Sequence, residues 1–328
     1  MVTAALVAAV AVWAVVLPPR RTRLSTSWSD GTVRGVLHVH SRTSDGGGTF
    51  DQIAAAAARA GLQFVVVTDH GDGTRTPEPP SYHAGVLMVD GVEVSTRGGH
   101  YIALGLPKTP YPLGGEPSDV VEDVRRMGGF GIVAHPDSPK PELAWQEWAA
   151  AADAVEVVNL DTAWRRDAAG GGVRVKWRLL QALLAYPPRP PEAIARLLTD
   201  SPGLRAQWFE SAESRPVVAL AGADAHAMLA LGDSDPGSGG AYLPIPSYDA
   251  AFASLSVHVR TDRPFSGNPQ EDTDALLRAL RAGRAYVAVD GWASPAALTF
   301  TATSEGRTVD AGGVLQAGPP VKIGRAHV

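Results

Sequence analysis

Histidine and acidic residues gather in five short clusters along this 328-residue chain. Imidazoles and carboxylates bind zinc, manganese and iron in proteins without thiolate ligands, and the chain contains no cysteine. Each cluster lies at the end of an apolar stretch that is typical of a strand. The clusters are His38-Val39-His40 with Asp45, Thr68-Asp69-His70, Glu93 with His100, His135-Pro136-Asp137, and Asp224-Ala225-His226. Together they predict a metallohydrolase whose ligands converge from separate strands.

The spacing within two clusters favours shared metal ligands. His38 and His40 are two residues apart on an expected strand, so both side chains project from the same face and can reach one ion. Asp45 follows within a short turn, which leaves its carboxylate near the same rim. Asp224 and His226 repeat this spacing after another apolar run.

Glu93 interrupts an otherwise apolar strand. A buried carboxylate is costly unless it is paired or bound to metal, so Glu93 is the candidate for a ligand that bridges two ions. His135 also follows an apolar strand, and Pro136 disfavours an early helix and keeps the ring at the strand end. His100 alone could equally be a hydrogen-bonded core residue.

Some of these residues have simpler explanations. Thr68 and Asp69 suit a helix cap at a strand exit, although a cap does not require His70. His83 and His258 belong to no such cluster, and we expect them to be structural or exposed.

Composition excludes several classes of function. A net charge of -5 and a pI near 6.0 provide no basic footprint for nucleic acid. A small, anionic substrate remains possible because bound dications reverse the local potential. The glycine-rich runs match neither a Walker motif nor a dinucleotide fingerprint. The chain also lacks a Gly-x-Ser-x-Gly nucleophile motif, so covalent catalysis is disfavoured.

Expected strands and helices alternate from Gly35 to Val289, which favours a parallel sheet or barrel. Thr49 suits a helix N-cap and Gly61 the end of the same helix. We also expect a helix over Glu142 to Ala152 and a loop over Ala168 to Gly172.

The amino-terminal segment is almost wholly apolar from Val2 to Leu17 and precedes three arginines. It is slightly shorter than the roughly 20 residues of a spanning helix, yet very hydrophobic for a soluble end. We therefore predict an uncleaved membrane anchor over residues 1–24 and a membrane-anchored protein, with the side of the membrane undecided.

The carboxyl-terminal segment loses the helical pattern. Residues 292–321 contain short alternating stretches and Gly-Gly turns, which indicate the start of a truncated β module. Residues 322–328 can be back-translated into a widely used sequencing adapter, so we predict that they are a non-native tail and leave His327 aside.

With these motifs, residues 31–291 resemble the PHP family of metallohydrolases, named for polymerase and histidinol phosphatase. The family carries His-x-His near its amino end and Asp-x-His near its carboxyl end. Ser44-Asp45-Gly46, the run Thr68 to Gly73 and the trailing β segment are most similar to the CehA/McbA-like group. The resemblance implies an α/β fold, namely a distorted (β/α)7, TIM-like barrel with metals at the carboxyl ends of its strands.

The resemblance also implies two or three divalent ions of zinc, manganese or iron. By the family pattern, His38, His40, Glu93 and Asp224 hold one ion, Glu93, His100 and His135 a second, and Asp45, His70 and His226 a third where one is present. Some family members carry His at the position of Asp45, so occupancy of the third site stays open.

Two cations that share Glu93 would bind a water and lower its pKa toward ~7. This chemistry predicts a phosphoesterase that uses a metal-bridging hydroxide, with Glu93 and Asp69 as candidate catalytic carboxylates. Two alternatives stay open. One is a carbamate, ester or amide hydrolase of the CehA/McbA type, and the other is a non-catalytic metal-binding module at a membrane.

Overall fold

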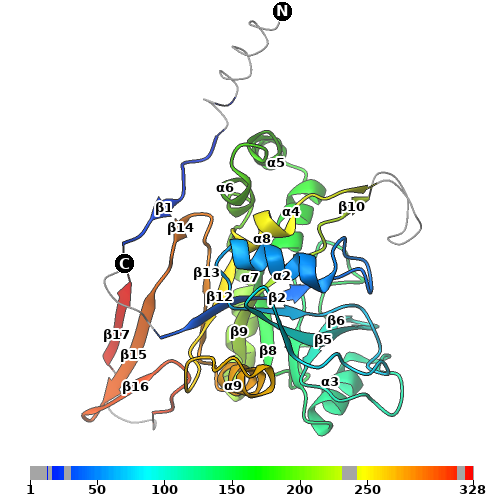
Figure 1. The fold of residues 1–328 in the computed structure, drawn as a ribbon, viewed down its shortest axis with the longest axis vertical. Coiled ribbons are helices and arrows are strands. Elements are labelled where there is room, and N and C mark those ends of the chain that lie inside the picture. The colour runs from blue at the N-terminus through cyan, green and yellow to red at the C-terminus, as the bar shows by residue number, and fades with distance from the viewer. Residues whose placement is uncertain (1–12, 14–16, 26–30, 231–241, 316–321, 328) are drawn as a thin grey trace, which may run out of the picture.

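The computed structural model describes residues 13, 17–25, 31–230, 242–315 and 322–327. Its centre is a closed barrel of seven strands (Figure 1). Neighbours follow the order β2, β3, β5, β6, β7, β8, β9, and β9 pairs with β2 to close the barrel. The strands are β2 (Val33–Val39), β3 (Phe64–Val67), β5 (Val86–Thr96), β6 (Gly99–Leu104), β7 (Phe130–Val133), β8 (Ala154–Asn159) and β9 (Val218–Ala225).

The barrel mixes strand directions, so the expected (β/α)7, TIM-like barrel is wrong. β6 runs antiparallel to both β5 and β7, whereas the other neighbouring pairs are parallel. Only Arg97 and Gly98 separate β5 from β6. A connection this short permits a hairpin, while a parallel neighbour requires a longer crossover.

Three shorter strands extend this sheet: β4 (Ser81–His83), β12 (Ser256–Val259) and β13 (Ala285–Ala288). The described helices lie around the barrel (Figure 1), with α5 and α6 at one end of the molecule and α9 at the other. They are α2 (Phe50–Arg59), α3 (Pro117–Arg126), α4 (Leu160–Ala169), α5 (Val173–Ala185), α6 (Pro190–Ala195), α7 (Pro202–Ser214), α8 (Tyr248–Phe252) and α9 (Pro269–Arg281).

Local sequence explains α2 and β3 well. Thr49 and Gln52 form a reciprocal capping box at the start of α2, and the chain leaves the helix at Gly61, where φ is 73°. Ile53 and Ala57 of α2 are buried against the barrel. All residues of β3 are buried, as expected for a parallel strand that is covered on both faces.

One local expectation was wrong, and another was only partly correct. The segment from Glu142 to Ala152 forms turns rather than a helix, because its backbone bonds elsewhere: Trp145 N donates to Pro136 O and Gln146 N to Gly98 O. The loop expected over Ala168 to Gly172 is confirmed for residues 170–172, whereas Ala168 and Ala169 are the end of α4.

The predicted membrane anchor over residues 1–24 is contradicted. No helix among the described residues combines the length and the apolar character that a membrane crossing needs. Residues 1–12 and 14–16 of this segment lie outside the described residues. In the described part, Trp13 Nε1 donates to Leu184 O, and β1 (Thr22–Arg23) pairs with β14 (Ala293–Ser294). The apolar run alone was the basis of the prediction, and its length was marginal from the start.

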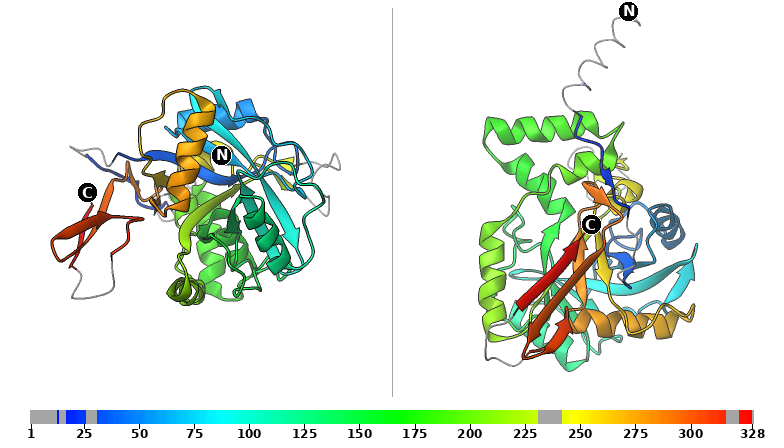
Figure 2. Two further views of the ribbon diagram at one scale, coloured as in Figure 1. Left: turned by 90° about the horizontal axis from the view of Figure 1, so that it is seen from below. Right: turned by 90° about the vertical axis from the view of Figure 1, so that its left-hand side faces the viewer.

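A three-stranded antiparallel sheet follows the barrel and lies beside it (Figure 2). It contains β15 (Leu298–Ser304), β16 (Arg307–Asp310) and β17 (Lys322–His327). A separate hairpin pairs β10 (Leu229–Ala230) with β11 (Tyr242–Leu243). The proposed domain limits and the non-native origin of residues 322–328 stay predictions.

Candidate metal centre

All nine residues predicted as metal ligands meet at one rim of the barrel. Their potential ligand atoms form four overlapping groups, and within each group the atoms lie within 4.8 Å of one another. The groups are His38, Glu93 and His135; His38, His40 and Asp224; His70, Glu93 and His100; and His40, Asp45, His70 and His226. The expected convergence of distant segments is therefore observed, while the binding of ions by these residues stays a prediction.

Strand direction explains this convergence. His38 and Asp224 lie in the last residues of β2 and β9, and His135 follows β7, so all three come from the carboxyl ends of strands. His100 is the second residue of β6. Because β6 is antiparallel to its neighbours, its beginning reaches the rim where their ends lie.

Glu93 of β5 lies at the centre of the cluster and is 1% exposed. Its Oε1 atom is 2.8 Å from His100 Nδ1 and 2.9 Å from His135 Nε2. Its Oε2 atom is 3.1 Å from His38 Nε2 and 3.2 Å from His40 Nε2. Burial alone would raise the pKa of Glu93, but the charge of His38 and hydrogen bonds with the other rings lower it well below its usual value. Glu93 is thus an ionised carboxylate shared by several imidazoles.

His40 has an unsatisfied nitrogen in this cluster. Its Nε2 atom is buried and forms no hydrogen bond, although Glu93 Oε2 and Asp224 Oδ1 lie 3.2 Å and 3.6 Å away. Buried polar atoms normally form hydrogen bonds, so a buried nitrogen without one needs a specific explanation. A cation between the imidazole and the two carboxylates would provide one.

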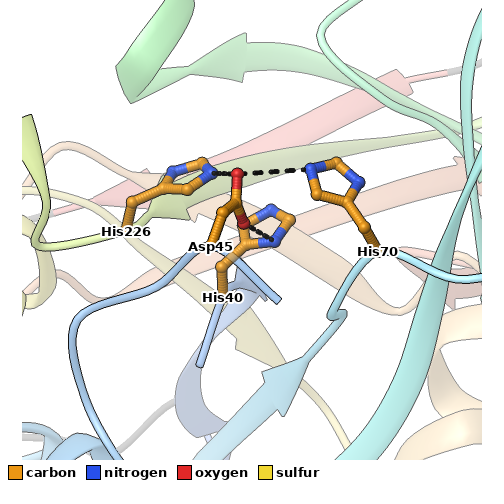
Figure 3. A group of neighbouring side chains, drawn as sticks. All are labelled: His40, Asp45, His70 and His226. Carbon is orange, nitrogen blue, oxygen red and sulfur yellow. Dashed lines mark ion pairs between the residues drawn. The ribbon is translucent and has the colours of Figure 1, made fainter. Parts of the chain in front are cut away.

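Asp45 joins three imidazoles on the outer side of the cluster (Figure 3). Its Oδ1 atom is 3.3 Å from His40 Nδ1, and its Oδ2 atom is 3.2 Å from His226 Nε2 and 3.5 Å from His70 Nε2. Burial would raise the pKa of Asp45, but hydrogen bonds with these three rings lower it well below its usual value. This group therefore also combines an anionic oxygen with several ring nitrogens.

The backbone is strained at three of the predicted ligands. The φ angle is 62° at His38, 29° at His135 and 44° at Asp224, in the left-handed region that non-glycine residues rarely adopt. The pairing of β2 with both β3 and β9 is irregular near His38. Such outliers concentrate at functional sites, where surrounding contacts hold side chains in otherwise unfavourable positions.

Sequence analysis missed one carboxylate beside the centre. Glu156 of β8 is 2% exposed, and its Oε1 atom lies 2.8 Å from His38 Nδ1. The strand reads Ala-Val-Glu-Val-Val-Asn, so Glu156 interrupts an apolar run just as Glu93 does. The same signal could have identified it.

Asp69 lies beside the cluster but in none of the four groups. Its Oδ1 atom accepts hydrogen bonds from Ser41 N (2.7 Å) and Ser44 Oγ (2.6 Å), and its Oδ2 atom accepts one from Ser41 Oγ (2.6 Å). Both carboxylate oxygens thus contact the turn that carries Asp45. The catalytic role expected for Asp69 stays a prediction.

The two histidines expected to be structural or exposed lie outside the four groups. His83 Nδ1 is 2.6 Å from Asp51 Oδ1 at the surface, and His258 is buried in β12 near Tyr286.

Arg165 is a cation on α4, a helix that was not predicted from the sequence. Burial would lower its pKa, but Asp161 and the more distant Asp224 and Asp45 raise it above its usual value. Its guanidinium pairs with Asp161 and lies over the Trp164 ring, 4.7 Å from the ring centroid. Asp161 is therefore the main partner of Arg165, and the charges of the two rim carboxylates add smaller contributions.

The donor set fits divalent metal. It contains six imidazoles and three carboxylates, a combination that suits zinc, manganese and iron. Burial disfavours a charged His38, yet Asp224, Glu156 and Glu93 raise its pKa well above the usual value. The carboxylates therefore favour positive charge in this space. Bound divalent ions would supply that charge while the imidazole rings stay neutral.

Comparison with known proteins gives two sequence relatives and no matching protein-family model. The chain is 31% identical over 118 residues to the uncharacterized protein MJ1587 of Methanocaldococcus jannaschii; the match spans 31% of this chain and 67% of that protein. It is 36% identical over 78 residues to the phosphoribosyl 1,2-cyclic phosphate 1,2-diphosphodiesterase of Eggerthella lenta. That second match spans 21% of this chain and only 30% of the enzyme.

Among solved structures, the chain resembles a two-domain protein of Bacteroides vulgatus that contains a predicted PHP-like metal-dependent phosphoesterase. The TM-score is 0.42 at 18% identity, over 83% of this chain and 69% of that one. A likeness at this level establishes neither a shared fold nor a shared activity. None of these similarities bears on the CehA/McbA-like group.

Proposed function

The chain belongs to the family of the uncharacterized protein MJ1587 of Methanocaldococcus jannaschii, and from its site we propose that it is a metal-dependent phosphoesterase of the PHP type. The observation that carries this proposal is Glu93, a buried carboxylate within 3.2 Å of four imidazole nitrogens. A carboxylate in that position is suited to bridging two cations.

We assign the ligands to two inner ions and one outer ion. By the PHP family pattern, His38, His40, Glu93 and Asp224 would hold the first, Glu93, His100 and His135 the second, and Asp45, His70 and His226 the third. In support, His38, His40 and Asp224 form one of the four observed groups, and Asp45, His70 and His226 form another together with His40. His100 and His135 both lie within 2.9 Å of Glu93 Oε1. The imidazole and carboxylate donors favour zinc, manganese or iron.

When bound, divalent ions supply Lewis acidity and an activated water. The residues of the chain set where this chemistry occurs. Glu93 belongs to two of the side-chain groups, so it fixes their spacing. The deep burial of Glu93 and His38 excludes bulk water and strengthens electrostatic interactions. The side chain of His70 is 35% exposed and leaves the rim open to a substrate on that side.

Two observations favour a phosphoester over other substrates. The Eggerthella lenta relative is named as a phosphodiesterase, although the chain matches only 30% of it. The second is that the charges of the rim carboxylates Asp224 and Asp45 act on Arg165, whose guanidinium would bind a non-bridging oxygen of an anionic substrate through a charge-assisted hydrogen bond.

We propose a positioning role for Asp69. Because its two oxygens accept three hydrogen bonds from Ser41 and Ser44, it holds the turn that presents Asp45 to the outer imidazoles. This role does not require Asp69 to transfer a proton.

The alternative from the CehA/McbA likeness is hydrolysis of a carbamate, ester or amide, for which the same donors are chemically suitable. An assay panel separates the possibilities. The purified protein, loaded with manganese or zinc, is offered bis-p-nitrophenyl phosphate, p-nitrophenyl phosphate and a naphthyl carbamate. We expect turnover of a phosphate ester that is lost in chelator and restored by metal.

Turnover of the carbamate alone would favour the alternative. Stoichiometric metal without turnover of any substrate would favour a non-catalytic metal-binding protein. Failure to bind either metal at all would contradict the entire assignment. His83→Ala is the matched control, because His83 pairs with Asp51 outside the cluster and its loss should leave metal content unchanged.

A further inference from the structure

Glu156 is a buried carboxylate that connects two of the predicted ligands without belonging to any of the four groups. Its Oε1 atom lies 2.8 Å from His38 Nδ1. Its Oε2 atom accepts hydrogen bonds from His135 N (2.8 Å) and from Asn159 Nδ2 (2.9 Å). Glu156 thus contacts a ring on β2 and the backbone after β7 from its own position on β8.

The neighbouring strand leaves room for this side chain only because it carries Gly222. A Cβ atom on Gly222 would lie 2.1 Å from Glu156 Oε1 and 2.4 Å from its Cδ atom. Gly222 pairs with Leu37 of β2 and Asn159 of β8 in the barrel wall, so the backbone there is held on both sides. The absence of a side chain at residue 222 is therefore a condition for the position of Glu156.

The partners of Glu156 determine how the His38 ring is protonated. A carboxylate only accepts hydrogen bonds, so the Nδ1 atom of His38 must carry a proton to bond with it. The Nε2 atom, which lies 3.1 Å from Glu93 Oε2 and 3.4 Å from Asp224 Oδ1, is then left with its lone pair free for a cation. Hydrogen bonds of this kind fix the tautomer and raise the basicity of metal-binding histidines.

We propose that Glu156, seated against Gly222, is the positioning residue of the metal centre: it selects the Nδ1-protonated tautomer of His38 and clamps the strained backbone of His135. The proposal rests on the metal centre proposed above. The clamp matters because φ at His135 is 29°, and the hydrogen bond from its N–H group to Glu156 Oε2 opposes relaxation of that backbone. One side chain thereby holds two residues that contact Glu93, His38 at 3.1 Å and His135 at 2.9 Å.

Glu156→Gln tests the choice of tautomer with almost no change in shape. The single amide oxygen must accept from His135 N and Asn159 Nδ2, which turns the amide NH₂ toward His38 Nδ1. That nitrogen then has to accept, and the proton moves to the Nε2 atom that faces the metal. We expect zinc affinity, measured by chelator competition, to fall about 10- to 100-fold, while the melting temperature of the metal-free protein changes little.

The matched control is Glu116→Gln, which removes a carboxylate from an exposed pair with Arg97 and should leave zinc affinity unchanged. An affinity of Glu156→Gln within twofold of the unaltered protein would overturn the proposal. If the unaltered protein itself binds no zinc, the proposed metal centre fails instead, so the two failures are distinguishable.

A measurement on the unaltered protein removes any dependence on the folding of the variant. In zinc-loaded protein with ¹⁵N-labelled histidine, long-range ¹⁵N–¹H correlation reports which ring nitrogen carries the proton, and the His38 signals are identified by their loss in His38→Asn. We expect His38 to be protonated at Nδ1 and bound to zinc through Nε2. Zinc on Nδ1, or a proton on Nε2, would overturn the proposal.

Discussion

The inner and outer parts of the metal centre differ in burial and in backbone. The inner part (His38, His40, Glu93, His100, His135 and Asp224) has side chains that are at most 12% exposed, whereas those of the outer part (Asp45, His70 and His226) are 21–35% exposed. Left-handed φ angles occur at three of the six inner residues and at none of the outer three.

This contrast indicates that the packing of the barrel holds the inner side chains in fixed positions, whereas the outer side chains are held less tightly. Water cannot reach a deeply buried site to replace a lost ligand, so the loss of one inner ligand should affect the binding of metal by the others. The outer residues remain accessible to solvent, which can replace a lost ligand. We therefore expect tightly held inner ions and a more readily exchanged outer ion.

The largest expected effect comes from the centre of the inner part. Glu93→Gln removes the charge that two groups share, and we expect the loss of metal together with a decrease in activity of about 10³-fold, which corresponds to about 4 kcal/mol. Mass spectrometry of bound metal and phosphate-ester turnover would measure the two losses. His38→Ala and Asp224→Ala should behave alike, and full metal content in any of these variants would contradict the inner assignment.

A smaller effect is expected from the outer part. Asp45→Asn removes the anionic partner of three imidazoles, and we expect one bound ion fewer with activity reduced about 10- to 100-fold. Counting metal per chain decides the result. If Asp45→Asn emptied all the sites, the division into inner and outer parts would be wrong.

Arg165 lies outside both parts and should affect the substrate rather than the metal. Loss of a charge-assisted hydrogen bond in Arg165→Met should raise KM for bis-p-nitrophenyl phosphate about tenfold, with metal content and kcat little changed. Arg59→Met is the matched control, because Arg59 forms an exposed pair with Asp249. An unchanged KM in Arg165→Met would count against anion binding by this residue.

The smallest effect concerns a buried carboxylate outside the metal centre. Asp272 of α9 accepts hydrogen bonds from Ser266 N, Gly267 N and Tyr82 Oη. Burial would raise its pKa, but these hydrogen bonds lower it to about 2. Protein donors thus satisfy Asp272 completely, whereas Glu93 is surrounded by rings that could also hold metal.

Because the pKa of Asp272 in the folded state lies below that in the unfolded chain, its charge stabilises the fold above about pH 4, and this contribution disappears as pH falls through about 2. Asp272→Asn should therefore lower the free energy of unfolding by about 1 kcal/mol at neutral pH. The difference should shrink in acid and be insensitive to chelator. Urea titrations at several pH values, with and without chelator, would reveal any departure from this pattern.

Much of the candidate site could be predicted because local patterns mark its residues. His38 and His40 are recognisable from two-residue spacing on a strand, and Glu93 from its place in an apolar run. The architecture was less accessible. The apolar pattern of β6 is the same for a parallel and an antiparallel strand, so only the short connection at Arg97 and Gly98 indicates that β6 reverses direction. Arg165 was not predicted as a site residue because the sequence pattern is indistinct after Asn159, and no helix was expected there.

The sequence by itself determined which side chains are available for metal and that they lie near strand ends, because residue type and the two-residue period of a strand are local properties. Only the tertiary structure decided the closure of the barrel between β2 and β9, the reversal of β6 that brings His100 to the rim, and the contact of Glu156 with His38 across 118 residues. These features depend on pairing between distant strands. The importance of Gly222 can be recognised only in the folded structure, where a Cβ atom at this position would clash with the Glu156 carboxylate.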